Sequence, residues 1–142
     1  MKEETKFVND KPSCLHLSLK NKWFEMTKAG IKTEDYREIN DYWASRFLRD
    51  KESKLTIEQI VRYILNHKYY GYEEVQSIFK YHYFFLKDFN HNKMTLGYPK
   101  STNTERILKF EHKGIEIRTG KPEWGAEVDK LYFVIKHGER IL

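Results

Sequence analysis

The segment Gly30–Arg37, which reads GIKTEDYR, decides how this chain is interpreted. It follows an amphipathic segment, Leu19 to Ala29, and Gly30 suits the position just after a helix end because glycine adopts left-handed backbone conformations freely. The residues after Gly30 predict a strand that emerges from the turn. A lysine and an arginine fixed at such a junction can bind an anion, such as a nucleic-acid phosphate. We therefore expect a functional site in this segment.

Length and composition predict one domain that covers residues 1–142. The 26 Lys and Arg residues exceed the 21 Asp and Glu residues, which gives a formal net charge of +5. This excess is spread along the chain, so it favours an anionic partner only weakly. Aromatic residues make up 15% of the chain, and most of them are expected in the core. A few exposed rings would be able to stack on nucleic-acid bases.

Cysteine use and hydropathy predict a cytoplasmic protein. Cys14 is the single cysteine, so no intramolecular disulfide is possible, and a reducing compartment fits best. Residues Met1 to Asp10 lack the apolar region of a secretory signal, and no apolar run approaches the roughly 20 residues that span a bilayer. The six histidines show no metal-binding spacing, so we expect no metal and no cofactor.

The first part of the chain predicts alternating strands and helices. Residues 1–12 are polar and are expected to form a loose arm. Strict alternation over Cys14–Leu19 predicts a strand whose leucines face inward. The apolar spacing from Leu19 predicts a helix that ends before Gly30, and Ile31–Arg37 is predicted as a second strand. A helical stripe from Ile39 to Leu48 follows.

The middle of the chain, residues 52–89, is interpreted as a helical insertion. Thr56 and Gln59 fit a capping box, in which each side chain satisfies a backbone N–H at the helix start. The apolar residues from Ile57 to Leu65 then have the spacing of one buried helical face. Tyr72 to Asp88 is predicted as a further helix because it is long and carries acidic residues early, although Tyr81 to Leu86 alone is compatible with a strand.

The last part of the chain has β character. The predicted strands are Met94–Tyr98, Thr104–His112, Gly114–Thr119 and Leu131–Lys136, with a junction near Lys113 and Gly114. Gly138 is expected to separate a short closing segment. The fold class is therefore α+β, with a small curled mixed sheet or barrel and helices packed outside it. Such curling would limit exposed strand edges.

The order Gly30, Lys32, Asp35 and Arg37 resembles the signature of the ASCH domain family, which belongs to the PUA-like superfamily of small β-barrels. The opening segment, Leu17 to Gly30, is similar to the strand and helix with which the family begins. Further segments resemble a bacterial and phage-associated branch: Gly97-Tyr98, Gly114–Ile117 with Gly120–Ala126, and Tyr132–Ile135. The resemblance covers roughly Leu15 to Arg49 and Met94 to Leu142.

This resemblance implies a PUA-like β-barrel with a cleft between barrel and helix, lined by the signature residues. The resemblance also implies RNA binding in that cleft, where members of the superfamily bind RNA. A few ASCH-like proteins are enzymes, including amidohydrolases that act on acetylated cytidine and some ribonucleases. The expected partner is therefore RNA or a nucleotide-like ligand, and fold transfers more readily than activity across such a family.

Five residues are the candidate anion- and nucleic-acid-binding residues: Lys32, Asp35, Tyr36, Arg37 and Trp124. Arg37 can bind a phosphate through two N–H groups, and Lys32 can act as a point charge. Asp35 would orient Arg37 or accept from a base amine, while Tyr36 or Trp124 would stack. On a regular strand, Lys32 and Asp35 point to opposite faces, so they meet only if the strand starts irregularly after Gly30.

Three alternatives stay open. The charges of Lys32 and Arg37 can instead form an intramolecular salt-bridge cluster with Glu34 and Asp35. A hydrolase is a second alternative, although Asp35 stands where the related amidohydrolases carry a catalytic threonine, and a ribonuclease would pair Lys32 with His16. The third is a protein-interaction module that makes contacts through the helical insertion.

Overall fold

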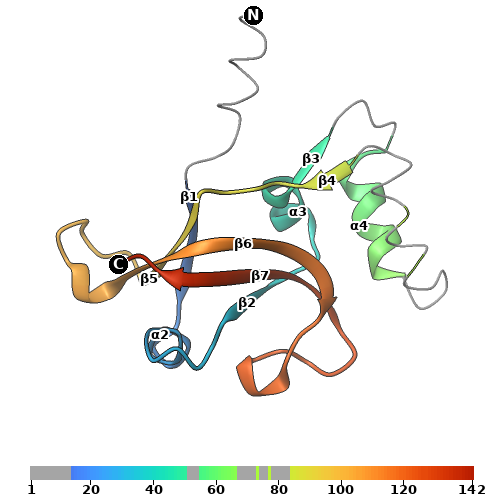
Figure 1. Ribbon diagram of the computed structural model, residues 1–142. Helices are drawn as coiled ribbons and strands as arrows, with labels where there is room; N and C mark the ends of the chain where they lie inside the picture. The colour runs from blue at the N-terminus through green and yellow to red at the C-terminus, as the bar shows by residue number, and fades with distance from the viewer. Residues whose placement is uncertain (1–13, 51–54, 67–72, 74–76, 78–83) are drawn as a thin grey trace, which may run out of the picture. The chain divides into compact units, whose positions relative to one another are not determined.

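The computed structural model describes residues 14–50, 55–66, 73, 77 and 84–142 (Figure 1). These residues form a mixed α+β structure, which confirms the predicted α+β class. The α-helices are α2 (Asn21–Lys28), α3 (Asp41–Phe47) and α4 (Ile57–Leu65), and two short 3-10 helices cover Thr104–Arg106 and Pro122–Trp124. The strands are β1 (Cys14–Leu19), β2 (Glu34–Glu38), β3 (Leu48–Asp50), β4 (Phe84–Leu86), β5 (His91–Leu96), β6 (Ile107–Thr119) and β7 (Leu131–Arg140). The predicted N-terminal arm lies outside the described residues.

A five-stranded sheet has the order β1-β5-β6-β7-β2. β1 pairs with β5 in parallel, and β5 pairs with β6 antiparallel, so the sheet is mixed as expected. β3 and β4 form a separate two-stranded antiparallel ribbon. Within the described part of the chain, no helix has the length and apolar character needed to cross a bilayer.

Contacts along the chain divide it into two compact units. The first unit comprises Met1–Asp35, Asp88–Gly114 and Ile135–Leu142, and the second comprises Tyr36–Lys87 and Ile115–Val134. Buried apolar side chains of the first unit include Leu17, Phe24, Met94, Leu108 and Ile135. Those of the second unit include Phe47, Ile60, Ile64, Phe133 and Val134. Each unit therefore has buried apolar side chains of its own.

The first strand and the capped helix follow their sequence patterns. In β1 the leucines at 15, 17 and 19 are buried and alternate with exposed His16 and Ser18, as predicted. At the start of α4, the Gln59 amide donates to Thr56 Oγ1 over 3.2 Å, and Gln59 Oε1 accepts from the Thr56 amide at 2.9 Å. Both bonds of the predicted capping box are thus present.

The end of α2 determines how the signature segment enters the sheet. Gly30 has a φ of 77°, and the amides of Gly30 and Ile31 donate to the carbonyls of Thr27 and Met26 over 3.1 and 3.0 Å. This is a Schellman C-terminal motif, which requires a left-handed residue after the helix. The Lys32 amide also donates to the Met26 carbonyl. The chain is therefore still turning at Lys32, and the predicted strand start at Ile31 is wrong because β2 begins at Glu34.

Other boundaries also differ from the predictions. Phe84–Leu86 forms β4 and pairs with β3, so the helix predicted over Tyr72 to Asp88 is wrong at these residues. Glu73 and Ser77 are helical, and the rest of Tyr72–Tyr83 lies outside the described residues. The two strands expected on either side of Gly114 are a single strand, β6, and β7 continues through Gly138.

Gly138 lies inside β7, where side chains of β6 approach it closely. A Cβ at this position would lie 2.6 Å from Lys113 Cε and 3.0 Å from Glu111 Cβ. Glycine is therefore needed here for close approach rather than for a chain reversal.

Candidate functional site

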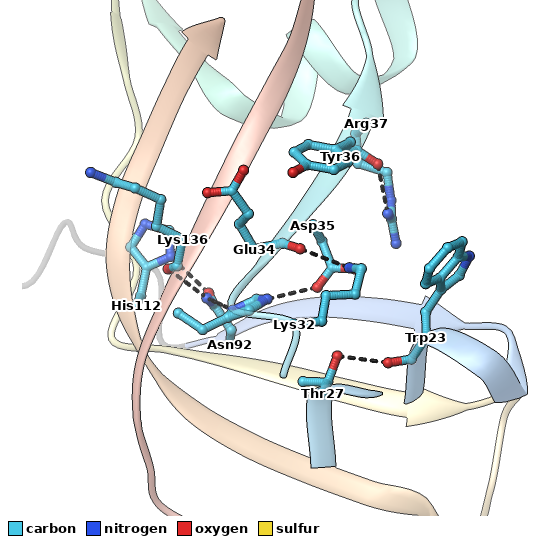
Figure 2. Close-up of polar contacts among 11 residues, drawn as sticks. Trp23, Thr27, Lys32, Glu34, Asp35, Tyr36, Arg37, Asn92, His112 and Lys136 are labelled. Carbon is cyan, nitrogen blue, oxygen red and sulfur yellow. Dashed lines mark hydrogen bonds and ion pairs between the residues drawn. The ribbon is translucent and has the colours of Figure 1, made fainter. Parts of the chain in front are cut away.

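Lys32 is buried at the turn that precedes β2, with 3% of its surface exposed. Its ammonium group forms an ion pair with Asp35 Oδ1 and donates to the Glu34 carbonyl oxygen over 2.7 Å. Figure 2 shows the Lys32 side chain directed at both groups. The irregular strand start is what brings Lys32 and Asp35 together. The predicted salt-bridge alternative therefore describes how Lys32 is bound in this structure.

Asp35 also contacts a histidine from the far end of the chain. Its Oδ2 atom lies 2.6 Å from Nε2 of His137, a residue of β7 whose side chain is 1% exposed. Burial alone would raise the pKa of Asp35, but the hydrogen bond to His137 and the charge of Lys32 outweigh burial and hold the pKa well below its ordinary value. Asp35 is therefore ionised at neutral pH.

Asn92 extends this arrangement, and its contacts show which nitrogen atoms of His137 and His112 carry a proton. Its Nδ2 atom lies 2.7 Å from His137 Nδ1 and 3.3 Å from the Lys136 carbonyl oxygen, while its Oδ1 atom lies 2.7 Å from His112 Nδ1 (Figure 2). An amide nitrogen only donates, so His137 Nδ1 accepts and His137 Nε2 carries the proton given to Asp35. By the same logic, His112 Nδ1–H donates to the Asn92 oxygen.

We call these five residues the Lys32 network: Lys32, Asp35, Asn92, His112 and His137. They all belong to the first compact unit. Lys32 and Asp35 supply one cation and one carboxylate, and the Asn92 contact assigns His137 as a neutral imidazole. His112 Nε2 lies 3.9 Å from Asp88 Oδ1. A buried polar network whose donors and acceptors match can favour one packing arrangement over others.

The indole ring of Trp23 lies beside this network. Lys22 Nζ and Lys32 Nζ lie 4.8 and 5.7 Å from the centroid of the ring, within the range of cation–π attraction. Thr27 Oγ1 donates to the Trp23 carbonyl over 2.7 Å, which ties the start of α2 to its last turn. Trp23 is half-buried and Lys22 is exposed. Trp23 lies in the segment that the sequence predicted only as a helix ending before Gly30.

The other candidate residues lie in the second compact unit, described here by itself. Arg37 Nη1 donates to the Tyr36 carbonyl over 2.9 Å, and its guanidinium lies 5.3 Å from the Trp43 ring centroid. The Tyr36 hydroxyl accepts from the Lys121 amide over 2.9 Å, and Lys121 Nζ lies 4.3 Å from the Trp124 ring centroid. The carboxylate of Asp35 is bonded to Lys32 and His137, so the expected orientation of Arg37 by Asp35 is not the arrangement found.

His16 and Cys14 do not join the Lys32 network. Leu15 and Asn92 are paired in the sheet and both are buried, whereas His16 lies on the opposite, exposed face of β1. The acid–base pair of His16 with Lys32 that a ribonuclease would need is therefore not formed. Burial raises the pKa of the Cys14 thiol, which disfavours the nucleophilic thiolate.

Sequence reasoning missed His137, Asn92 and His112. Each lies on a strand far along the chain. His137 contacts Asp35, Asn92 contacts His137, and His112 contacts Asn92. The available signal was a polar residue at an inward position of a strand, as at Asn92. Among the described residues, no group of three or more His, Cys, Asp and Glu side chains is arranged to hold a metal ion.

Comparisons with protein-family models, with curated proteins and with solved structures find no match for this chain.

Proposed function

We propose that this chain is an RNA- or nucleotide-binding domain of the ASCH-like, PUA-like type, working in the cytoplasm. The resemblance of Gly30, Lys32, Asp35 and Arg37 to the family signature supports the proposal, and so does the net charge of +5. In the proposed β-barrel, the signature segment lines the ligand cleft.

The observation that carries the proposal is the position of Trp23 beside Lys22 and Lys32. An indole ring offers a stacking surface for a base, and the exposed ammonium of Lys22 offers a contact for the adjoining phosphate. The charge of Lys32 is neutralised by Asp35. Its proposed role is therefore to hold the Trp23 ring in place rather than to bind a phosphate. A preformed site of this kind loses little entropy on binding.

Arg37 is the proposed phosphate ligand of the second unit. Its guanidinium is held over Trp43 and bonded to the Tyr36 carbonyl, which limits its rotamer freedom. A planar guanidinium held in this way can bind a phosphate through two N–H groups. Tyr36 and Trp124 are proposed as supporting aromatic residues, since Lys121 links both of them.

The test is fluorescence anisotropy with a labelled single-stranded RNA of mixed sequence, at low and moderate salt. Wild type should bind, and its affinity should fall as salt rises. Trp23→Leu keeps an apolar side chain on α2 and should weaken binding at least about fivefold, because base stacking on an aromatic ring is lost. Arg37→Gln should weaken binding and reduce the salt dependence by about one phosphate contact.

The matched control is Lys28→Gln, which removes one exposed charge from the same helix as Trp23. It should bind like wild type within about twofold, as expected for a charge that makes no phosphate contact. RNA binding that is equal in wild type, Trp23→Leu and Arg37→Gln would contradict the proposed site. No binding by the folded wild-type protein would contradict the proposed function.

A hydrolase acting on a modified nucleoside is the second candidate, because Lys32, Asp35 and His137 form one hydrogen-bonded chain. Release of acetate from N-acetylated cytidine tests it, with His137→Gln expected to abolish any turnover and Lys28→Gln to retain it. On α4, Ile60, Val61 and Ile64 are buried while Leu65 is exposed, so the helix shows little apolar surface for the third alternative, a protein-interaction module.

A further inference from the structure

Three basic side chains form a row across the first compact unit. β5 lies between β1 and β6, and its register places Lys93 opposite His16 on one side and opposite Lys109 on the other. The flanking positions Leu17, Met94 and Leu108 are buried, so alternation puts the row on the opposite face of the sheet. We call His16, Lys93 and Lys109 the basic row.

Lys93 and Lys109 lie directly opposite each other on antiparallel strands, and no ion pair links either one to another described residue. Like charges at such positions destabilise a sheet. Glu111 is the acidic residue on the next row, opposite His91. Its Oε2 atom lies 4.0 Å from Lys113 Nζ, and its Oε1 atom accepts from the Glu139 amide over 2.9 Å. The positive charge of the row is therefore left largely uncompensated by the described side chains.

His16 is held in one orientation at the end of the row. The Thr95 hydroxyl donates to the Gly97 carbonyl over 2.7 Å, so it accepts from His16 Nε2–H over 2.8 Å. Burial and the charge of Lys93 lower the pKa of His16, so this residue is neutral at neutral pH. Because its Nε2–H is donated to Thr95, it offers a ligand the Nδ1 lone pair as an acceptor rather than a charge.

Tyr98 adds an exposed aromatic ring beside this end of the row. Its ring is 88% exposed and lies edge-on to the His16 ring, with the two centroids 6.5 Å apart. It follows Gly97, whose φ of 70° turns the chain out of β5. An aromatic ring exposed in this way offers a face on which a nucleic-acid base can stack.

We propose that the basic row and Tyr98 bind single-stranded RNA, with backbone phosphates at Lys93 and Lys109 and a base stacked on Tyr98. A single strand is specified because bases in a duplex are already stacked on each other and cannot reach an exposed ring. This inference rests on the proposed function and deepens it, since it assigns RNA contacts to a sheet face remote in sequence from the signature segment.

The experiment measures anisotropy of a labelled, mixed-sequence single-stranded RNA across a salt series. Lys93→Gln/Lys109→Gln should make the negative slope of log K against log salt shallower by about 1.4, because each phosphate contact to a single strand contributes about 0.7. Tyr98→Leu should weaken binding at least about fivefold while leaving the slope unchanged. The charge-matched control is Lys28→Gln/Arg62→Gln, which changes two exposed residues outside the row and should keep the wild-type slope.

The outcomes separate this inference from the proposed function. If Lys93→Gln/Lys109→Gln binds RNA as tightly as wild type and with the same salt slope, the basic row is overturned and the proposed function stands. An equal loss in the control pair overturns it as well, because the effect is then one of net charge. Absence of RNA binding by the wild-type protein overturns both. Duplex RNA bound as tightly as single-stranded RNA, with Tyr98→Leu unchanged, overturns the stacking contact.

Discussion

Asp35 is a buried carboxylate bonded to two side chains, Lys32 and His137. Asp35→Asn would leave the Lys32 ammonium buried without its counter-charge, and breaking a buried pair in this way costs about 3–5 kcal/mol. The double variant Lys32→Met/Asp35→Asn removes both charges and should cost clearly less than the single one. Urea unfolding at neutral pH measures both free energies. A double variant less stable than Asp35→Asn would contradict this account.

The lowered pKa of Asp35 also predicts how stability depends on pH. The unfolded carboxyl titrates near its ordinary pKa of about 3.9, whereas the folded one titrates lower. The folded state therefore binds fewer protons, and the stabilisation is present above about pH 4 and is lost as pH falls toward the folded pKa. Urea unfolding from about pH 5 to about pH 2.5 should show a steeper loss for wild type than for Lys32→Met/Asp35→Asn. Parallel curves for the two proteins would mean that the Lys32–Asp35 pair contributes nothing to the pH dependence of the free energy of unfolding.

The candidate site shows how far the sequence reaches at the residue scale. Lys32 and Asp35 were found because they lie in one short segment, where local geometry relates them. His137 and Asn92 were not found because their partners come from separate strands, and nothing in a local pattern records such pairing. Asp35 was expected to orient Arg37, its neighbour on an ideal strand. The structure instead satisfies this carboxylate with Lys32 and His137, which lie within the same unit.

At the scale of the element, the Schellman turn at Gly30 positions Lys32. Apart from its chain neighbours, a Cβ at position 30 would have no atom within 4 Å, so a side chain there meets no steric clash. The only cost in free energy is that of the left-handed backbone conformation. Gly30→Ala should therefore destabilise the protein by about 1–2 kcal/mol. Gly30→Asn should cost less, because asparagine tolerates this conformation better. Equal stability of wild type and Gly30→Ala in urea unfolding would contradict this assignment.

The opposition of Lys93 and Lys109 makes a separate prediction for the β5–β6 pair. Lys109→Glu replaces a like-charge pair by an opposite-charge pair and should stabilise the fold by about 0.2–1 kcal/mol. Lys109→Thr, which only removes the repulsion, should give a smaller gain. Thermal unfolding at low salt measures both. A loss of stability in both variants would show that Lys109 has a stabilising partner and that the row is not a site of repulsion.

Local patterns predicted some elements well and others badly. β1 and α4 were predicted because one buried face repeats with a fixed period and, in α4, because a capping box marks the start. Gly114 and Gly138 were taken as strand ends, yet both lie inside long strands. At position 138, glycine leaves room for side chains of β6 that approach closely, and this approach depends on tertiary packing. The strand β4 depends on its pairing with β3, so its local sequence did not reveal it.

At the scale of the whole molecule, the two compact units share continuous strands. The chain passes from one unit to the other between Asp35 and Tyr36 in β2, between Gly114 and Ile115 in β6, and between Val134 and Ile135 in β7. Val134 and Ile135 are both fully buried. A strand that supplies core residues to both units cannot leave one core without disturbing the other. We therefore expect a single cooperative unfolding transition.

Tryptophan fluorescence can test this expectation, because Trp23 lies in the first unit while Trp43 and Trp124 lie in the second. Trp43→Phe/Trp124→Phe retains a reporter of the first unit, and Trp23→Phe/Trp43→Phe retains one of the second. In each variant, the urea midpoint from fluorescence should equal the midpoint from far-ultraviolet circular dichroism. If instead fluorescence and circular dichroism gave separate midpoints, the units would unfold independently, and the strands that run through both would act only as linkers.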